Sequence, residues 1–492
     1  MLRTSLSHPL QIAAVPTLPG HGRIGLTFCP GKVQPGAVTG AWNRDLALDV
    51  RAISDWGAAA VVTLIEPHEL TSLEVEGLGA EIEGQHMDWF HAPIPDVSIP
   101  DAGFEATWPL IGEGLRNRLR AGFDVVVHCK GGLGRAGMIA ARLLVELGVE
   151  PEVAIERVRE ARPGAIETLA QEAHVCRTLK VPERKPSQEL EAIRDRAIGA
   201  MLGLALGDAL GTTLEFKARD TYLPVADIVG GGPFGLEPGQ WTDDTAMALA
   251  LADSLAKSNG LDEQDLLARF RAWWRNGTYS CTGHCFDIGG TTAQALRRWE
   301  QTRADHCGST DAYSAGNGSL MRLAPVAIRF WNDRPALRDA AARQSKTTHA
   351  ALEAVDACVL YAEILADAIE GRPRSEVLKA REGGWAGKID AIAGGSWRGK
   401  HRSQIRASGY VAHALEAALW AVGRTTSFPD AICLAANLGE DADTTAAIAG
   451  QLAGALGGSA AFPAAWTGKL VWQEHLSETA DTLFAASQGR DQ

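Results

Sequence analysis

The chain has 492 residues, more than one hydrophobic core usually organises, so its length alone predicts two or three domains. Its composition, 46% hydrophobic and 22% charged residues, is typical of a globular protein and excludes a disordered chain. The formal charge of -13 excludes the broad basic field that indiscriminate nucleic-acid binding needs, although a local pocket can still hold phosphate.

The eight cysteines are scattered along the chain, which fits reduced thiols in a cytosol better than disulfides. The N-terminal segment MLRTSLSHPLQIAAVPTLPGHG has only a short apolar stretch, and the longer apolar segments elsewhere are interrupted by Asp208 or Gln451. We therefore expect a cytoplasmic protein, with neither a secretory signal nor a membrane span or membrane partner.

Strands alternate with helices in the first part of the chain. AAAVVTLIE, from residue 58, and GFDVVVHC, ending at Cys129, predict buried strands, whereas AGMIAARLLVELG and EPEVAIERVREAR predict helices. This order predicts an α/β domain in which a central sheet is flanked by helices.

A change of composition marks a domain boundary near residue 186. LKVPERKPSQELEAIRD interrupts the apolar periodicity with two prolines and mixed charges, as a linker does. Beyond it, Ala-rich segments with helical spacing dominate, and their many Gly and Ala residues suit close helix packing. We expect domains at 1–182 and 193–492 joined by a linker at 183–192, the second domain being nearly all α.

A glycine-rich loop directly follows Cys129. HCKGGLGR places five residues between Cys129 and Arg135 and leads straight into a helix. The backbone N–H groups of such a loop can converge on one anion, and the helix N-terminus adds a favourable potential. The same environment favours a thiolate, and the guanidinium of Arg135 can bind two phosphate oxygens. A buried structural cysteine or a metal ligand is the alternative, but no second thiol or close histidine pair accompanies Cys129.

These residues resemble the cysteine-dependent protein-tyrosine and dual-specificity phosphatases over about residues 20 to 180. The resemblance is closest to the cyclin-dependent-kinase-inhibitor-3-like branch, through CPGK, PIPD and HCKGGLGRAG. It implies Cys129 as nucleophile, Arg135 as phosphate binder and Asp96 as general acid, with Asp101 the weaker alternative. It also implies that phosphate binds to the loop residues Lys130, Gly131, Gly132, Leu133 and Gly134.

The sequence departs from this family at two places. Ala136 stands where most members carry a Ser or Thr hydroxyl that helps the thiolate leave, so turnover of a phosphoenzyme is expected to be slow. In GAIETLAQ, Glu167 stands where tyrosine phosphatases often have a water-positioning glutamine, and Gln171 is nearby. The residue that orients the hydrolytic water is left open.

Two acidic motifs, WTDDT and GEDADTT, lie about 200 residues apart in the second domain. Crowded carboxylates need a cation to stay ionised, and Mg²⁺ and Mn²⁺ prefer such oxygen ligands. Each motif also opens an Ala-rich helix, so N-capping by Asp and Thr is the alternative. Polar motifs elsewhere, including SAGNGSLMRLAP, GDALGTTLEF and SKTTHA, look like parts of one site assembled in a helical bundle.

From residue 192 to about 475, these motifs in this order resemble the ADP-ribosylglycohydrolase family. The resemblance implies an all-α fold with two Mg²⁺ or Mn²⁺ ions ligated by Thr242, Asp243, Asp244, Asp441, Asp443 and Thr444. It implies cleavage of the bond at C1″ of ADP-ribose, with Glu215 and Asp287 at the scissile end. Diphosphate and distal ribose are then expected to contact Asn317, Gly318, Ser319 and His349. CTGHC could instead bind zinc, although it lacks a second ligand pair.

Together the two halves predict a bifunctional hydrolase. It would act on a phosphomonoester and on an ADP-ribosylated protein, nucleic acid or small molecule, in sequence on one substrate or on unrelated substrates. The rival hypothesis is that the first domain is a phosphate-reading recruitment module with weak catalysis. The sequence leaves open the acceptor of the ADP-ribosyl group and the choice between Mg²⁺ and Mn²⁺.

Overall fold

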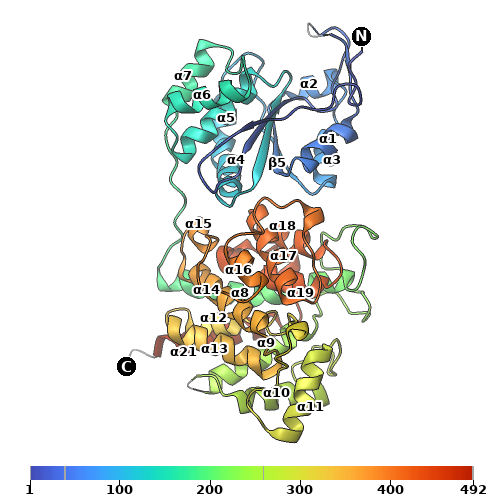
Figure 1. Ribbon diagram of the computed structural model, residues 1–492, viewed down its shortest axis with the longest axis vertical. Helices are drawn as coiled ribbons and strands as arrows, with labels where there is room; N and C mark the ends of the chain where they lie inside the picture. Colours follow the sequence, from blue (N-terminus) through green and yellow to red (C-terminus); the bar gives the residue numbers. More distant parts are fainter. Residues whose placement is uncertain (1, 38–39, 259, 490–492) are drawn as a thin grey trace. The chain divides into compact units, whose positions relative to one another are not determined.

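The computed structural model describes residues 2–37, 40–258 and 260–489, and the chain divides into two compact units (Figure 1). The first unit holds the chain up to Glu183, and the second holds nearly all of the chain from Arg184 onward. Each unit has its own core.

A mixed five-stranded sheet with the order β1-β2-β7-β5-β6 organises the first unit. β1 is antiparallel to β2, and the other neighbouring strands are parallel. β5 and β7 are buried along their whole length, which explains their continuous apolar runs and confirms both predicted strands. The strands are Ala13–Val15 (β1), Ile24–Phe28 (β2), Ala58–Thr63 (β5), Asp88–His91 (β6) and Asp124–Cys129 (β7), and a separate ribbon pairs Val33–Gln34 (β3) with Trp42–Asn43 (β4).

Helices cover both sides of this sheet, with α1 and α3 on one side and α4 to α7 on the other (Figure 1). The predicted helices after Cys129 are confirmed as α5 and α6. α5 is buried throughout and ends at Gly148, whose φ of 106° suits glycine, and α6 begins at Pro151. The helices are Leu46–Asp55 (α1), Pro67–Ser72 (α2), Leu78–Gly84 (α3), Ala102–Arg120 (α4), Gly134–Leu147 (α5), Pro151–Ala161 (α6) and Leu169–Arg177 (α7).

The second unit is helical, as predicted, and the described part of it contains no named strand. Long loops separate α8 from α9 and α16 from α17. Its helices are Leu190–Gly211 (α8), Asp243–Lys257 (α9), Glu263–Asn276 (α10), Gly290–Thr302 (α11), Ala324–Phe330 (α12), Arg334–Thr348 (α13), Leu352–Glu370 (α14), Arg374–Val377 (α15), Lys388–Ala393 (α16), Val411–Arg424 (α17), Phe428–Ala436 (α18), Ala442–Gly457 (α19), Ala464–Thr467 (α20) and Gln473–Gln488 (α21).

Two helices, α8 and α19, pack backbone against backbone in this unit. Small residues recur every four positions on α8, which places them on one face: Gly199, Gly203, Gly207 and Gly211. A Cβ on Gly203 would lie 2.2 Å from the carbonyl oxygen of Gly450, and one on Gly450 would lie 2.0 Å from that of Gly203. Only glycine at both positions allows this approach, which brings Asp208 on α8 toward Asp443 on α19.

The segment Leu190–Leu214, which contains α8, is long and apolar enough to span a membrane by length and composition alone. Most of its side chains are buried inside the helical unit. Its apolar character is therefore explained by its place in the core of that unit.

Candidate functional sites

The strand β7 ends at Cys129, and the loop that follows curls around the sulfur. The N–H of Gly132 points at Cys129 Sγ, 3.2 Å away. Gly132 has a φ of 72°, and a Cβ there would lie 2.5 Å from the backbone of Thr27, so the loop needs glycine at this position. Helix α5 then begins at Gly134. The predicted loop thus directs the backbone N–H of Gly132 at the thiol.

The guanidinium of Arg135 lies beside Cys129, where two carboxylates hold it. Glu69 binds it bidentately, with Nη1–Oε2 and Nη2–Oε1 distances of 2.6 and 3.0 Å. Asp96 forms an ion pair with Nη2 at 2.8 Å. The Asp101 carboxylate instead caps α4 by accepting from the N–H of Phe104, so Asp96 is the acid that the fold brings to the loop.

Glu69 is a site residue that the sequence motifs did not reveal, because it lies on α2, 66 residues before Arg135. Burial disfavours its charged form, but the hydrogen bonds from Arg135 outweigh burial and lower the pKa of Glu69. Its one sequence signal is a capping box with Glu66, since Glu69 Oε2 also accepts from the N–H of Glu66 at 3.0 Å. The carboxylate is thus ionised and fixes the orientation of the guanidinium.

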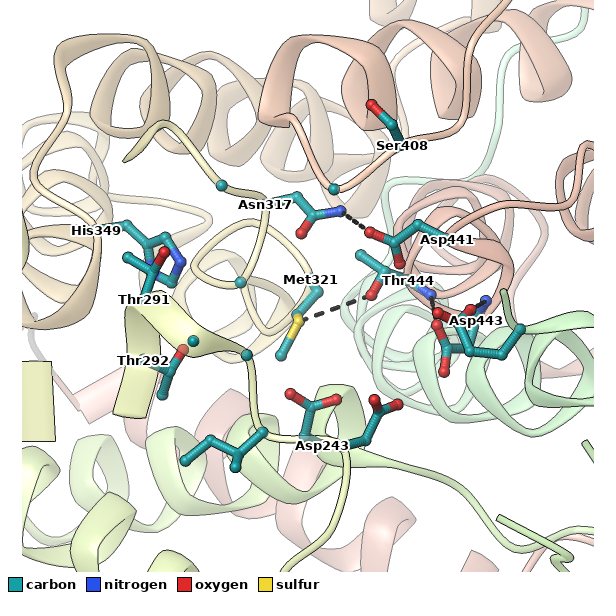
Figure 2. A pocket seen from close by; sticks show the side chains of 18 of the residues that line it. Asp243, Thr291, Thr292, Asn317, Met321, His349, Ser408, Asp441, Asp443 and Thr444 are labelled. Carbon is teal, nitrogen blue, oxygen red and sulfur yellow. Dashed lines mark hydrogen bonds between the residues drawn. The ribbon is translucent and has the colours of Figure 1, made fainter. Parts of the chain in front are cut away.

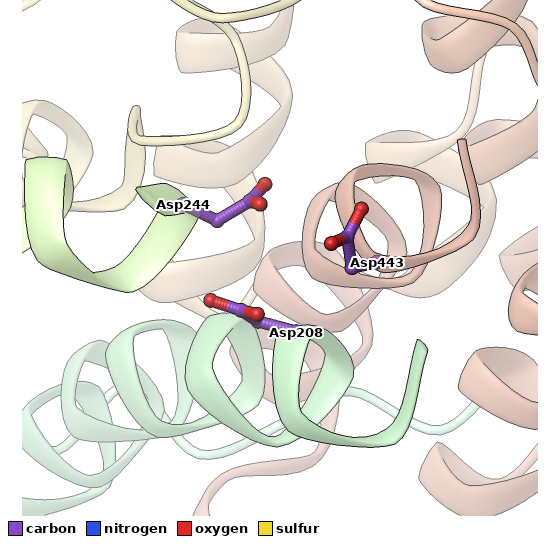
Figure 3. A group of neighbouring side chains, drawn as sticks. All are labelled: Asp208, Asp244 and Asp443. Atoms are coloured by element: carbon purple, nitrogen blue, oxygen red, sulfur yellow. The ribbon is translucent and has the colours of Figure 1, made fainter. Parts of the chain in front are cut away.

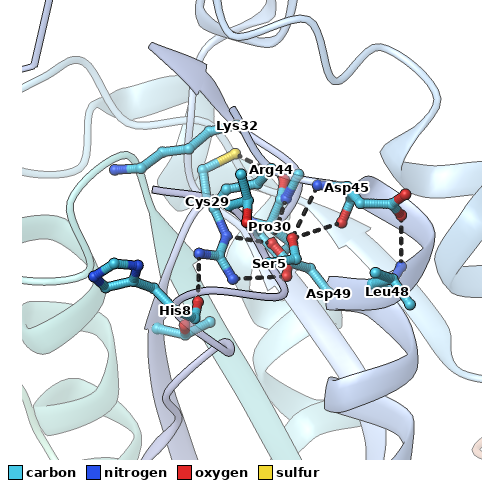
Figure 4. A network of polar contacts seen from close by, with 12 residues as sticks. Ser5, His8, Cys29, Pro30, Lys32, Arg44, Asp45, Leu48 and Asp49 are labelled. Atoms are coloured by element: carbon cyan, nitrogen blue, oxygen red, sulfur yellow. Dashed lines mark hydrogen bonds and ion pairs between the residues drawn. The ribbon is translucent and has the colours of Figure 1, made fainter. Parts of the chain in front are cut away.

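The CPGK segment supplies a cation next to the same loop. Lys32 Nζ donates to the carbonyl of Lys130 at 3.1 Å. Figure 4 shows the polar network that holds this segment: Asp49 accepts from the N–H of Gly31 at 2.9 Å and pairs bidentately with Arg44 at 2.7 and 2.8 Å. Because Asp49 and Arg44 are both buried, the network is rigid and positions Lys32.

The two residues proposed for the hydrolytic water occupy different environments. Gln171 is fully buried, accepts from the N–H of Glu167 at 2.9 Å and donates to the carbonyl of Ser98 at 3.3 Å. Glu167 is exposed, and its carboxylate would lie 2.2 Å from a Cβ on Gly134. Glu167 therefore faces the start of α5, while Gln171 ties neighbouring loops together. Ala136 is buried and presents no hydroxyl to the thiol.

In the helical unit, three buried carboxylates from three helices meet: Asp208 on α8, Asp244 on α9 and Asp443 on α19 (Figure 3). Each offers an oxygen within 4.8 Å of the others. A second group, Glu215, Asp441 and Asp443, meets the same criterion and shares Asp443 with the first. These are the two carboxylate groups of metal-binding geometry among the described residues.

The N-capping alternative for the acidic motifs is wrong, because the caps come from other segments. The Thr242 and Asp441 side chains form no capping hydrogen bond at the starts of α9 and α19. Asp208 instead accepts from the N–H groups of Thr242 and Thr245, at 2.9 and 3.1 Å. Self-capping therefore does not explain Asp244, Asp441 and Asp443, whose oxygens accept instead from the Thr242 hydroxyl, the Asn317 amide and the N–H of Thr444.

Glu215 plays the same part for α19 that Asp208 plays for α9. Its Oε2 accepts from the N–H groups of Ala442 and Asp443, at 2.8 and 3.3 Å. Asp208 is the site residue that sequence reasoning did not assign. Its signal was an aspartate inside an otherwise apolar, glycine-striped helix.

The donor set fits a divalent cation. Asp244 Oδ1 is buried without a hydrogen-bond partner, and the Thr242 hydroxyl has Asp208, Asp244 and Asp443 within 3.5 Å but only one hydrogen to share. Burial and neighbouring carboxylates raise the pKa of Asp443 to about 7. The same causes raise the pKa of Asp287 to about 9 and that of Glu215 to about 12. A hard cation with oxygen ligands would remove this repulsion.

These carboxylates line a cavity of about 650 Å³ (Figure 2). Asp243, Glu215 and Asp287 join Asp441 and Asp443 on its wall, with Thr444 beside them. The remaining wall comes from polar loops and α11, through Thr291, Thr292, Gly316, Asn317, Gly318, His349 and Ser408. None of the described lining residues is Lys or Arg.

The far side of the cavity carries Asn317 and His349. The Asn317 side-chain amide donates to Asp441 Oδ2 at 2.9 Å, which joins the loop to the acidic motif. His349 Nδ1 is 2.9 Å from the Thr348 hydroxyl, which accepts from buried Arg322 at 2.8 Å. Burial and Arg322 lower the pKa of His349 to about 3, so its ring is neutral. That favours an Nε2–H that can donate to a ligand.

Three sequence-predicted groups lie outside this wall. Ser319 is buried behind it, with its hydroxyl 2.8 Å from that of Ser345. Thr242 and Asp244 sit beneath it in the carboxylate layer. Within the described ranges, the CTGHC residues form no cluster of metal-ligand atoms, and the Cys281 thiol donates to the carbonyl of Trp241.

The fold and the two sites define a fusion of a cysteine-phosphatase-like α/β domain with a helical, carboxylate-centred domain. Comparison with known families agrees on both halves. The ADP-ribosylglycohydrolase family matches residues 189–492, and the Swiss Army Knife protein, DSP-PTPase phosphatase domain family matches residues 31–175. The chain therefore belongs to the ADP-ribosylglycohydrolase family and carries a dual-specificity-type phosphatase domain at its N-terminal side.

Individual relatives support this assignment. The chain is 47% identical over 294 residues to ADP-ribosylarginine hydrolase Tri1 of Pseudomonas putida (strain GB-1), covering 60% of this chain and 79% of the relative. It is 30% identical over 166 residues to cyclin-dependent kinase inhibitor 3 of Rattus norvegicus, covering 33% and 76%. A solved ADP-ribosylglycohydrolase-related protein complex is similar with a TM-score of 0.54 and 39% identity, covering 60% and 99%.

Proposed function

We propose that the helical domain hydrolyses the glycosidic bond between ADP-ribose and an arginine side chain, using two Mg²⁺ or Mn²⁺ ions. The observation that carries this proposal is the pair of carboxylate groups sharing Asp443 at the wall of a cavity of about 650 Å³. A cavity of this size suits a nucleotide-sized ligand. Its carboxylates cannot accept an anionic diphosphate without cations, which the donor set is suited to bind.

Asp244, Asp441 and Asp443 would hold the ions, and Thr242 and Thr444 add hydroxyls next to them, 3.2 and 3.4 Å from Asp244 Oδ2. Bound ions of this kind anchor ribose hydroxyls and lower the pKa of a bound water. Asp208 keeps the start of α9 in place through its backbone hydrogen bonds. Asp243 lies on the cavity wall near the same carboxylates.

We assign proton transfer at the scissile bond to Glu215 and Asp287. Both line the cavity beside Asp443. A carboxyl group in this position can take up a proton and give it to the departing group. Asn317, Gly318 and the neutral ring of His349 then provide donors for the diphosphate and distal ribose.

Two facts support arginine as the acceptor over serine, a nucleic-acid end phosphate or a free metabolite such as O-acetyl-ADP-ribose. The relative with 47% identity is named an ADP-ribosylarginine hydrolase. The cavity also presents Glu215, Asp287 and Glu440 and no Lys or Arg among its described lining, which suits a cationic leaving group.

For the N-terminal domain we propose phosphomonoester hydrolysis through a cysteinyl-phosphate. Cys129 attacks phosphorus and forms the S–P bond while the leaving oxygen takes a proton from Asp96. Arg135 and the loop amides hold the phosphate oxygens, and water then cleaves the S–P bond to release phosphate. Glu167, which faces the start of α5, is the proposed orienter of that water.

A second candidate is that this domain reads phosphate and recruits the hydrolase to modified targets. Ala136 favours it, since the missing hydroxyl slows departure of the thiolate. If both activities exist, they could act in sequence on one cytoplasmic substrate, with ADP-ribose removal exposing a phosphate, or on separate substrates.

A substrate panel tests these proposals. The intact chain is given arginine-linked and serine-linked ADP-ribosyl peptides, ADP-ribosylated DNA 5′-phosphate, O-acetyl-ADP-ribose and an aryl phosphate, each with Mg²⁺, Mn²⁺ or EDTA. We expect metal-dependent release of ADP-ribose from the arginine conjugate and metal-independent release of phosphate. Preference for another acceptor would overturn the arginine proposal. If the aryl phosphate binds but no phosphate is released at any time, the recruitment module is favoured.

A further inference from the structure

An exposed phenylalanine borders the acidic end of the cavity. Phe216 follows Glu215 in the chain, lines the cavity, and leaves 68% of its surface exposed. Its ring meets Phe234 edge-on, with centroids 6.3 Å apart, and Phe234 lies 5.2 Å from Phe286. We call Phe216, Phe234 and Phe286 the aromatic rim. It runs from Glu215 to the residue before Asp287, so it connects the two carboxylates at the scissile end.

The backbone holds the ring of Phe216 in this exposed position. Phe216 has a φ of 61°, in the left-handed region that non-glycine residues seldom adopt. Its N–H donates to the carbonyl of Glu440 at 2.8 Å, and the N–H of Glu440 donates to the carbonyl of Lys217 at 2.8 Å. This reciprocal pairing keeps the two segments together. A costly conformation that keeps a large apolar ring in solvent at a cavity wall points to a ligand contact.

The charges around the ring indicate which ligand fits. Glu215, Asp287 and Glu440 line the same cavity as Phe216, and no Lys or Arg appears among its described lining residues. A neutral base such as adenine carries no charge to pair with three carboxylates and can offer them only its amino group. A guanidinium gains from both features, because it stacks on aromatic faces and its planar N–H groups bind carboxylates.

We propose that the aromatic rim is the acceptor subsite, where the arginine side chain of the ADP-ribosylated protein lies with its guanidinium over Phe216 and its N–H groups toward Glu440 and Asp287. This inference rests on the proposed hydrolysis of an arginine linkage and adds the residues that recognise the acceptor. The Phe216 ring lines the cavity and is also exposed to solvent, so a protein chain can reach it from outside. Phe234 packs against the Phe216 ring, and Phe286 packs against Phe234.

The test compares Phe216→Ala and Phe216→Tyr with the parent on two probes. The first probe is an arginine-ADP-ribosylated protein, assayed for kcat/KM of ADP-ribose release with Mg²⁺. The second is free ADP-ribose, which lacks the arginine, assayed for affinity by calorimetry with Mg²⁺. Leu223→Ala is the matched control, because Leu223 is a similarly exposed apolar residue, 89% exposed, that does not line the cavity. Thermal melts confirm that all variants fold.

We expect Phe216→Ala to lower kcat/KM on the arginine conjugate by about 3- to 30-fold, the span of cation–π contacts from exposed to desolvated sites. Phe216→Tyr should restore the parent value, and neither variant should change the affinity for free ADP-ribose. A Glu440→Gln change should lower only the arginine reaction. Equal losses on both probes would assign Phe216 to the adenine, and no loss on either would remove it from the site.

The parent enzyme separates this inference from the function it rests on. If the parent does not cleave the arginine conjugate but cleaves another acceptor, the proposed function is wrong and the subsite falls with it. If the parent cleaves the arginine conjugate and Phe216→Ala does so equally well, the function stands and the subsite alone is refuted.

Discussion

The close packing of α8 on α19 should control both the stability of the helical domain and its activity, and Gly203→Ala tests this. The added Cβ would lie 2.2 Å from the carbonyl oxygen of Gly450 and 3.2 Å from the Cα of Gly454. Ordinary contact begins at 3.4 Å, so the helices must separate by more than 1 Å. Because the obstacle is backbone, no side chain can rotate out of the way.

The magnitude follows from two opposing effects. Overpacking a tight core costs about 1–3 kcal/mol, and a clash with backbone belongs at the upper end. Replacing glycine by alanine within a helix returns about 1 kcal/mol of helix propensity. The net loss is about 2 kcal/mol, which lowers the Tm of a domain of about 300 residues by about 3 °C.

The same displacement should reach the catalytic carboxylates, because α8 carries Asp208 and α19 carries Asp443. A misplacement of about 1 Å can cost about 100-fold in rate, so we expect ADP-ribose release to fall much more than the loss of folded protein explains. Differential scanning calorimetry and a single-turnover release assay below the melting range measure the two effects.

Gly84→Ala is the control for the glycine-to-alanine change. Gly84 ends α3, and a Cβ there meets nothing within 4 Å, so the variant should be at least as stable as the parent. If Gly203→Ala keeps the parental Tm and activity, the glycine contact does not set the geometry. If it lowers the Tm but leaves the rate unchanged, packing and catalysis are not linked in the way we describe.

Three further predictions concern single groups. Glu69→Gln removes the ionised partner of Arg135, so phosphate release should fall at least tenfold, the cost of about 1.4 kcal/mol or more for a buried charged hydrogen bond, without change in ADP-ribose release. Ala136→Ser supplies the missing hydroxyl and should raise phosphatase turnover about 10- to 100-fold, since a hydrogen bond to a charged group is worth about 1.5–3 kcal/mol; an unchanged burst and steady-state rate would show that thiolate departure is not limiting. In EDTA, the folded-state pKa values of Asp443 and Asp287, about 7 and about 9 against an ordinary 3.8, mean that the folded domain binds more protons than the unfolded chain. Its Tm should therefore fall as the pH rises from about 4 to 9, and Mg²⁺ should restore it at the high end; a Tm that rises with pH in EDTA would contradict this.

A site could be predicted from the sequence where it is built from consecutive residues. Cys129, the loop and Arg135 follow one another, so their spacing already predicts the strand, the anion-binding loop and the helix that the fold contains. The all-α fold class of the second domain could also be predicted, because Ala-rich segments with helical spacing dominate its sequence.

Residues that act across the chain were harder to predict. Asp208 and Glu215 cap α9 and α19 from distant segments. The spacing of residues within one motif does not predict such long-range contacts. Self-capping consequently stayed an alternative to metal binding for the acidic motifs, whereas the fold supplies the caps of α9 and α19 from elsewhere. Glu69 reaches Arg135 over 66 residues and carried only a capping signal of its own helix. The aromatic rim likewise depends on two separate loops, one before α9 with Phe216 and Phe234 and one before α11 with Phe286.

We propose that one chain carries two separate hydrolytic sites, with the carboxylates around Asp443 serving only one of them. The most direct measurement is a crossed assay of ADP-ribose release from an arginine-ADP-ribosylated protein and of phosphate release from an aryl phosphate. It compares the parent, Asp443→Asn and Cys129→Ser, each with Mg²⁺. The account predicts that Asp443→Asn loses only ADP-ribose release and Cys129→Ser loses only phosphate release. Equal activity of all three proteins on both substrates would contradict it.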